Sequence, residues 1–403
     1  MVERLRSAIG LGSHRLGKRH QPSGLNVHIS AEDRTFSDYV SRIRKMLALA
    51  HSGRSAADLK NIVEGNCPFE LLPPMPGSAG KQKRYRRGVL LTHGLTDSPY
   101  LMRHLAASFQ QQGFRVMAIL LPGHGTQPGD LLDVHWTDWA DTVAYGIDRL
   151  DEEVDEIYLA GYSAGGTLSV YQSLRDDRVR GLFLFSPAFR ITSRAAWANL
   201  HRFYSWMNQE AKWVDIKPDL DIYKYESFPK NGAAQMHALT QAVGRLLRKQ
   251  EMKIPVFAAA SLDDATVDAS ATVAFMQQAH HPTNRLVLYT TDAAVFRAAL
   301  AAENLELVNS VVPEKKIFSS AHTAIVIPPS DTHYGEAGEY ANCLHYYPDA
   351  MAKYTACITH PESAQQGEVT ENVLVSGLLR RLTYNPDFAG LMVSMSRFID
   401  GLA

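Results

Sequence analysis

The chain has 403 residues, and 45% of them are hydrophobic, which is enough to bury a sizeable core and excludes a largely disordered protein. Lys and Arg number 41 against 42 Asp and Glu, so the formal net charge of -1 excludes a strong overall field for nucleic acid. The expected partner is therefore a small, weakly charged molecule.

Membrane and thiol features are sparse. No run of eighteen apolar residues occurs, and charges interrupt the first twenty residues where a signal peptide has its apolar core, so we expect a cytoplasmic protein without stable membrane insertion. The basic start favours a solvated tail, and peripheral contact with anionic lipid stays open: Arg4, Arg6, Arg15, Lys18 and Arg19. The three Cys residues are too scattered for a disulfide framework or a metal site, so we expect reduced thiols: Cys67, Cys343 and Cys357.

Residues 1–80 are predicted to form an N-terminal extension. It contains one amphipathic helical pattern, Phe36–His51, followed by the Pro-rich connector LLPPMPGSAG. The basic run KQKRYRR then leads into the first predicted strand of the core.

From residue 88 onward, short aliphatic runs alternate with helical patterns, which is typical of parallel βαβ units. The runs are nearly continuous rather than alternating, as expected for strands covered on both faces. The predicted strands are Gly88–His93, Arg115–Leu121, Glu156–Ala160, Gly181–Ser186, Pro255–Ala260, Arg285–Thr291 and Lys315–Ser319. The predicted helices are Ser98–Gln112, Trp136–Glu153, Ala164–Leu174 and Ala269–Ala279. The fold class is α/β with a mostly parallel sheet flanked by helices.

Two segments break this alternation: 188–254 is too long for a simple crossover between two strands, and 325–370 follows the last predicted strand without a strand pattern of its own. The first is rich in aromatic residues and follows the carboxyl end of a strand, so we expect a helical cap there: Phe189, Trp197, Phe203, Tyr204, Trp206, Trp213, Tyr223 and Tyr225. For any single one of these aromatics, ordinary packing is the favoured role. The predicted division is an extension at 1–80, a core at 81–187 and 255–403, and a cap at 188–254.

The sequence GYSAG at 161–165 joins a predicted strand directly to a predicted helix. A G-x-S-x-G turn of this kind is a nucleophile elbow, which exposes the serine hydroxyl at the helix N-terminus. Ser163 is therefore the candidate nucleophile. The backbone N–H groups of Ala164 and of Leu95, in the loop after the strand ending at His93, are the candidate oxyanion donors. His93 itself is interpreted as shaping that loop.

Four motifs in order, HGLTDSP (93–99), LPGHGT (121–126), WTDW (136–139) and GYSAGG (161–166), resemble the bacterial carboxylesterase and monoacylglycerol lipase branch of the α/β-hydrolase superfamily. The resemblance covers residues 88–187 well and 255–325 weakly. It implies an α/β-hydrolase fold and a triad in the order Ser, Asp, His.

By this resemblance the acid follows the strand after the cap and has Val three residues later, which selects Asp264 before Val267. Asp263 stays open as an alternative, and Asp268 reads better as a helix N-cap. The base is expected directly after the last strand, at His322, with His333 as the alternative. His124 is interpreted as bracing the site through backbone contacts.

These residues predict an ester hydrolase acting on a monoacylglycerol-like or other small acyl ester through an acyl-enzyme, with no metal and no cofactor. A thioesterase, an amidase or peptidase, and an acyltransferase would use the same triad. A catalytically dead binding module is the hypothesis from another class, and its signature would be a lost triad residue.

Overall fold

The computed structural model describes residues 16–26, 28–74, 84–190, 209–292, 304–370 and 377–402. The chain divides into two compact units: an N-terminal unit, Val2–Phe183 with Ser193–Glu251, and a C-terminal unit, Leu184–Thr192 with Met252–Ala403. Several residues named above lie outside the described residues: Arg4, Arg6, Arg15, Trp197, Phe203, Tyr204 and Trp206.

The sheet of the N-terminal unit is built on the predicted aliphatic runs. Its strand order is β1 (Phe69–Leu71), β3 (Arg115–Ile119), β2 (Tyr85–Thr92), β4 (Val154–Tyr162) and then β5 (Val179–Phe185), whose last two residues belong to the C-terminal unit. β2 pairs in parallel with β3 and with β4, while the short edge strand β1 is antiparallel to β3. The runs predicted at 88–93, 115–121, 156–160 and 181–186 are confirmed as strands.

Helices cover this sheet. α4 (Arg103–Gln111) packs on β3 and β1, after a short 3-10 turn, η2 (Pro99–Met102). α5 (Trp136–Asp151), α6 (Ala164–Ser173) and α8 (Lys230–Leu247) contact one another, and α5 and α6 also pack on β2 and β4, so these three helices share one layer. The predicted helices at 98–112, 136–153 and 164–174 are thus present with small shifts at their ends.

The described part of the N-terminal extension contains two α-helices, α2 (Phe36–Ala50) and α3 (Ala56–Asn66), which pack against each other. The buried face of α2 repeats every three or four residues, Phe36, Tyr39, Ile43 and Leu47, as its amphipathic pattern predicts. Thr35 caps α2 by accepting the N–H of Asp38. α3 and β1 are absent from the sequence prediction.

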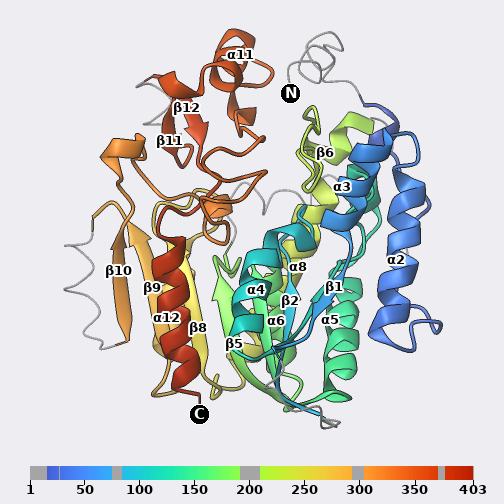
Figure 1. Cartoon of the computed structure of the whole chain (residues 1–403), viewed down its shortest axis with the longest axis vertical. Helices are drawn as coiled ribbons and strands as arrows, with labels where there is room; N and C mark the ends of the chain where they lie inside the picture. Colours follow the sequence, from blue (N-terminus) through green and yellow to red (C-terminus); the bar gives the residue numbers. More distant parts are fainter. Residues whose placement is uncertain are drawn as a thin grey trace. The chain divides into compact units, whose positions relative to one another are not determined.

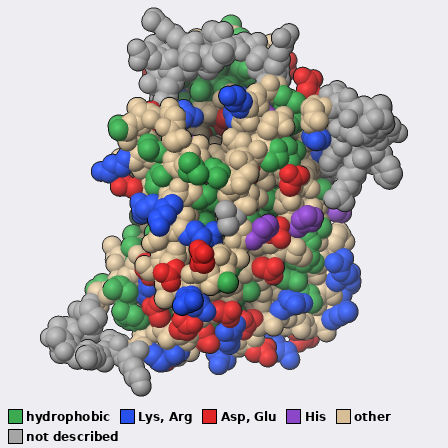
Figure 2. All heavy atoms as spheres, turned by 90° about the vertical axis from the view of Figure 1, so that its right-hand side faces the viewer, with side chains coloured by type: hydrophobic (Ala, Val, Ile, Leu, Met, Phe, Trp, Pro, Cys, Tyr) green, Lys and Arg blue, Asp and Glu red, His purple; other side chains and the backbone are tan. Residues whose placement is uncertain are grey.

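On the face viewed in Figure 2, acidic and basic side chains are interspersed, as the balanced composition implies.

The described part of the predicted cap, 209–254, differs from the expected set of short helices. It forms a 3-10 turn, η5 (Gln209–Lys212), and the antiparallel strands β6 (Trp213–Asp215) and β7 (Phe228–Pro229), before the long helix α8. α8 buries one face, including Met236, Leu239 and Val243, against its neighbours α5 and α6. Its apolar stripe is therefore used for packing in the helix layer.

In the C-terminal unit the parallel strands β8 (Val256–Ser261), β9 (Arg285–Thr290) and β10 (Leu305–Asn309) follow the end of β5 in that order. α9 (Ala269–Gln278) packs on β8, and α12 (Phe388–Asp400) packs on β8 and β9 (Figure 1). The segment after β10 carries α11 (Met351–Thr359) and the parallel pair β11 (Gln365–Gly367) and β12 (Leu379–Arg381).

Two sequence expectations are wrong in this unit. The run Lys315–Ser319 is not a strand, because Pro313–Lys315 forms a 3-10 turn and Lys316 has a φ of 54°, so that only Ile317 makes isolated bridges. Cys343 and Cys357 are joined by a disulfide across a sequence separation of 14, within a cluster of buried Tyr residues, whereas Cys67 is a free, buried thiol. Within the described ranges, none of the helices combines the length and apolar character needed to span a bilayer.

Candidate active site

Ser163 lies on the turn between β4 and α6. Its φ of 53° and ψ of -115° place a non-glycine residue in a sparsely populated region, and its carbonyl accepts the N–H of Gly166 at 3.0 Å as α6 begins. The residue is 9% exposed. This is the strand, strained turn and helix that a nucleophile elbow requires.

The two glycines of the turn are required by close backbone approach. A Cβ on Gly161 would lie 2.2 Å from the carbonyl carbon of Gly165, and a Cβ on Gly165 would lie 2.0 Å from the carbonyl oxygen of Thr92. Such distances are far inside van der Waals contact, so any larger residue would push β4 and α6 apart. The start of α6 therefore rests directly on the end of β2.

The loop that carries Leu95 begins at the same sheet edge. Thr92 pairs with Gly161 at the carboxyl ends of β2 and β4, so the loop after β2 and the elbow after β4 leave the sheet side by side. Leu95 and Ala164, the two predicted oxyanion donors, are both in the N-terminal unit. Thr96, next to Leu95, has a φ of 70° and donates its N–H to Nε2 of His124 at 3.0 Å.

His93 and His124 brace this loop. Nε2 of His93 accepts the N–H of Leu121 at 3.0 Å, so its Nδ1 carries the proton and donates to the carbonyl of Gly94 at 2.8 Å. Burial lowers the pKa of His93 well below its ordinary value, and burial lowers the pKa of His124 to about 4. Both imidazoles are therefore uncharged near neutral pH and hold the loop through hydrogen bonds to backbone groups, in line with their predicted bracing roles.

In the C-terminal unit, Asp264 and His322 meet although 58 residues separate them in sequence. Oδ2 of Asp264 lies 2.5 Å from Nδ1 of His322, and the two side chains are 1% and 6% exposed. The other carboxylate oxygen accepts the N–H groups of Thr266 at 2.7 Å and Val267 at 2.9 Å. Because a carboxylate accepts, Nδ1–H of the imidazole donates to Asp264. Nε2 is then the ring nitrogen that does not face this carboxylate.

The alternative residues have other neighbours. Asp263 accepts a hydrogen bond from the hydroxyl of Thr291 at 3.2 Å, and burial raises its pKa. Asp268 caps α9 through the N–H of Ser270, as predicted, and pairs with Arg190 at 2.8 Å. The ring of His333 is stacked on Tyr340 with 5.6 Å between centroids.

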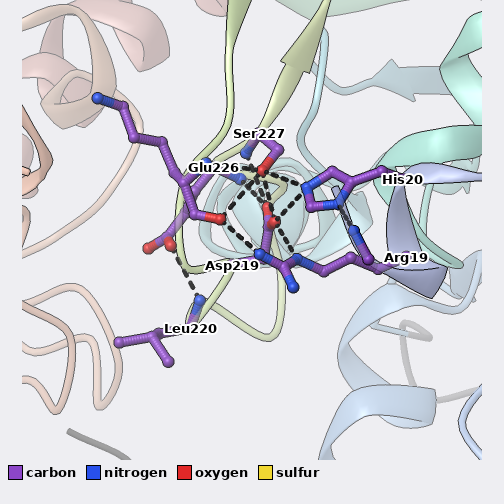
Figure 3. A network of polar contacts seen from close by, with 8 residues as sticks. Arg19, His20, Asp219, Leu220, Glu226 and Ser227 are labelled. Carbon is purple, nitrogen blue, oxygen red and sulfur yellow. Dashed lines mark hydrogen bonds and ion pairs between the residues drawn. The ribbon is translucent and has the colours of Figure 1, made fainter. Parts of the chain in front are cut away.

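A further Ser, His and Asp grouping occurs in the N-terminal unit (Figure 3). The hydroxyl of Ser227 donates to Asp219 at 2.6 Å and lies 3.3 Å from Nε2 of His20, while Arg19 pairs with the same carboxylate at 2.7 Å. Ser227 is fully buried and His20 is 1% exposed, so no substrate carbonyl can reach this hydroxyl. The grouping ties the N-terminal segment to residues 217–227.

A cavity of about 450 Å³ opens beside the loop of Leu95. Its wall includes Thr96 and residues 125–128, and the described part of the predicted cap contributes residues 219 and 221–225. Tyr225 connects these parts, because its N–H donates to the carbonyl of Thr96 and its hydroxyl accepts the N–H of Thr126, each at 2.8 Å. Charged groups also line the cavity, Arg54 and Asp221 among them, so its wall is mixed rather than purely apolar.

The predicted site residues are divided between the two units. Ser163, Ala164 and Leu95 belong to the N-terminal unit, and Asp264 and His322 belong to the C-terminal unit. Glu368, which accepts the backbone N–H of His322, was missed by the sequence analysis, because no local motif marks a residue that lies 46 positions further along. Among the described residues, no group of three or more His, Cys, Asp or Glu side chains is arranged to hold a metal ion.

Comparison with known proteins connects these features to a family. The chain is 31% identical over 156 residues to a thermostable monoacylglycerol lipase of Bacillus sp. (strain H-257), a match that covers 38% of this chain and spans 61% of the length of that curated relative. Solved structures with a similar fold include one of the metagenome-derived lipolytic enzymes LipS and LipT, at 22% identity, a TM-score of 0.45, and coverage of 61% of this chain and 87% of that one. A monoacylglycerol lipase of Paleococcus ferrophilus follows at 15% identity and a TM-score of 0.41, covering 73% and 98%. At TM-scores below 0.5 the two structures add no weight to the assignment.

The decisive match is to a family model. The model described as Hydrolase_4, serine aminopeptidase S33, matches residues 83–291, which include the elbow of Ser163, the loop of Leu95 and the acid loop of Asp264. Since that range is more than half of the chain, the protein belongs to this family of α/β-hydrolases.

Proposed function

We propose that the protein is a serine hydrolase that cleaves small carboxylic esters through an acyl-enzyme on Ser163. The observation that supports this most is the contact between Asp264 and His322, which orients an imidazole by a buried carboxylate. The elbow of Ser163 supplies a nucleophile of the kind that such an imidazole activates.

In this proposal Nε2 of His322 takes the proton of Ser163 Oγ as that oxygen attacks the ester carbonyl. The tetrahedral oxyanion is held by the N–H groups of Leu95 and Ala164. Collapse breaks the bond to the alcohol, which leaves with the proton from His322. Water then attacks the acyl-enzyme carbonyl as His322 takes a proton from it, and the second collapse releases the acid and returns that proton to Ser163 Oγ.

The nucleophile and base are tested by substitution. Ser163→Ala is expected to lower ester turnover by roughly 10³-fold or more and to abolish labelling by a fluorophosphonate, with an unchanged circular dichroism spectrum. His322→Ala is expected to fall to nearly the same level, whereas His333→Ala retains most activity. Ser227→Ala is the matched control, because that serine also contacts His and Asp but is buried, and it should keep full labelling. Normal turnover by Ser163→Ala would refute the proposal.

The substrate class is tested with a panel of p-nitrophenyl esters, a thioester and an amino-acid arylamide, since the family's description names an aminopeptidase. Each methylene that enters an apolar wall contributes roughly 0.8 kcal/mol, about four-fold in kcat/KM. We expect kcat/KM to rise from acetate to medium-length esters and then to level off or fall. A preference for the arylamide over every ester would assign the chain to peptide or amide hydrolysis instead.

A further inference from the structure

Glu368 is a buried acid placed against the backbone of His322. It follows β11, and its side chain is 1% exposed. Oε2 accepts the N–H of His322 at 3.1 Å, and Oε1 accepts the N–H of Val369 at 2.8 Å. The backbone N–H of Glu368 donates to the hydroxyl of Ser319 at 2.9 Å. Glu368 thus contacts the segment 319–322 at both ends, through Ser319 and through His322.

Arg381 neutralises this acid. β11 and β12 pair with Gly367 opposite Arg381, so the guanidinium lies beside the next residue, Glu368. Nε donates to Oε1 at 2.7 Å and Nη2 donates to Oε2 at 2.9 Å, which is the two-pronged geometry that fits Arg to a carboxylate. A buried carboxylate held this way costs little, whereas the same carboxylate without its partner is strongly unfavourable.

The guanidinium also reaches the acid loop. Nη2 of Arg381 donates to the hydroxyl of Thr266 at 2.7 Å, and the N–H of Thr266 donates to Oδ1 of Asp264 at 2.7 Å. The contacts therefore close into a ring that runs from the His322 backbone through Glu368, Arg381, Thr266 and Asp264 back to the His322 imidazole. All of its members lie in the C-terminal unit.

From this ring we infer that Glu368 and Arg381 are positioning residues, which hold the Asp264 and His322 loops in register for proton transfer. The inference rests on the proposed function, because it assigns His322 the role of base. The charged groups whose described contacts reach the His322 loop are Asp264 through the ring, Asp263 through the backbone of Ser320, Glu368, and Arg381 behind Glu368. The Glu368 and Arg381 charges cancel only while both are present.

This cancellation makes the two halves of the pair separable by experiment. Glu368→Gln leaves the guanidinium uncompensated, which disfavours the imidazolium, so the acid limb of the kcat/KM profile should move to lower pH by about one unit. Arg381→Met leaves the carboxylate uncompensated, which favours the imidazolium, so the same limb should move to higher pH by about one unit. Opposite shifts are not expected from a general loss of folded protein.

The double variant Glu368→Gln with Arg381→Met separates charge from position. Its acid limb should return close to that of the wild type, since both charges are removed together. Its kcat at the alkaline plateau should be roughly ten- to a hundred-fold below that of the wild type, with a smaller change in KM, because the two loops are no longer held together. Arg381→Lys keeps the charge and should restore the position of the limb, with kcat only partly recovered because an ammonium lacks the fork.

The matched control is Arg380→Met, one residue before Arg381 on β12. Its guanidinium donates to the carbonyl of Cys357 at 2.9 Å, away from the ring of contacts, so it removes the same charge without touching either loop. Its acid limb and plateau kcat should match those of the wild type. Thermal melts of every variant identify the temperature at which all are folded, and kinetics are measured there.

Titration of the His322 ring by NMR in histidine-labelled protein gives a readout that needs no turnover. Opposite shifts of that titration in the two single variants, together with full activity of Ser163→Ala, would support the positioning role of Glu368 and Arg381 and refute the proposed function. Identical limbs and plateau rates in all variants would refute the positioning role, as would a loss of activity that follows the folded fraction with no movement of the limb.

Discussion

Ser163 is held in a backbone conformation that costs of order 1–3 kcal/mol for a residue with a side chain. The strain is maintained by its surroundings, since Gly161 and Gly165 let β4, β2 and α6 approach within distances that no Cβ allows. The buried imidazoles of His93 and His124 then hold the neighbouring loop by accepting and donating to backbone groups. The two glycines thus allow the close backbone approach at the turn of Ser163, and the two histidines fix the loop beside it by hydrogen bonds.

His124 predicts a pH dependence of stability. Burial lowers the pKa of its imidazole from 6.5 to about 4, so between those values the unfolded chain binds a proton there that the folded chain does not. The resulting stability is complete above pH 6.5 and is lost as the pH falls toward 4, up to about 3 kcal/mol. Urea unfolding of the wild type and of His124→Gln at pH 7.5, 5.5 and 4.5 measures this. The variant should be less stable at pH 7.5 but should lose less on acidification.

The control for that series is His360→Gln, which removes an exposed histidine. Its free energy of unfolding should follow the wild-type curve at all three pH values. Equal acid losses in the wild type and in His124→Gln would show that the buried imidazole does not carry the dependence.

At the scale of elements, the N-terminal extension is joined to the core by specific polar contacts as well as by its apolar face. Tyr39 of α2 donates its hydroxyl hydrogen to the carbonyl of Leu120 at 2.9 Å and accepts the N–H of the same residue at 3.2 Å, directly after β3. Burial raises the pKa of this phenol, so it stays protonated and able to donate. α2 therefore supports the start of the LPGHG segment, which in turn carries His124.

Tyr39→Phe is expected to lower the free energy of unfolding by about 1–3 kcal/mol, because it leaves a buried carbonyl and N–H of Leu120 without this partner. Ester turnover per folded molecule should change little. Tyr171→Phe on α6, whose ring packs on Trp136, removes the same group and serves as the control. A neutral effect of Tyr39→Phe in urea unfolding would mean that water replaces the hydroxyl without cost.

At the scale of the whole molecule, the chain forms two compact units that share β5, and the C-terminal unit carries the disulfide. Cys343 and Cys357 close a short loop around buried Tyr346, Tyr347 and Tyr354. A cross-link over such a loop stabilises mainly by restricting the unfolded chain, typically by 2–4 kcal/mol.

Thiol counting checks this pairing directly. Alkylation in denaturant without reductant should label one cysteine per chain, Cys67, and all three after reduction. Reduction of the native protein should lower its melting temperature, and the variant with both Cys343→Ala and Cys357→Ala should show the same lower value with or without reductant. Three labels without reductant would refute the disulfide.

The sequence alone determined the features that depend on neighbours along the chain. Six of the seven predicted strands are present, because an aliphatic run of that length favours a strand wherever it is buried. The turn at Ser163 was predictable because a G-x-S-x-G sequence between a strand and a helix is a local motif, although the close approach of Gly165 to Thr92 belongs to the tertiary structure. The run 315–319 has only Ile317 and Phe318 as apolar residues, and the 3-10 turn at Pro313–Lys315 overlaps its start, so it does not form a strand.

Only the tertiary structure decided which distant residues meet. The choice of Asp264 over Asp263 as the partner of His322, the clamp of Glu368 and Arg381, and the pairing of Cys343 with Cys357 each join residues that are 13 to 58 positions apart. Their partnership with Ser163 stays a prediction. Strand register and loop packing bring such groups within hydrogen-bonding distance, and neither is specified by local propensity, because a one-residue change of register turns a side chain to the opposite face of a sheet.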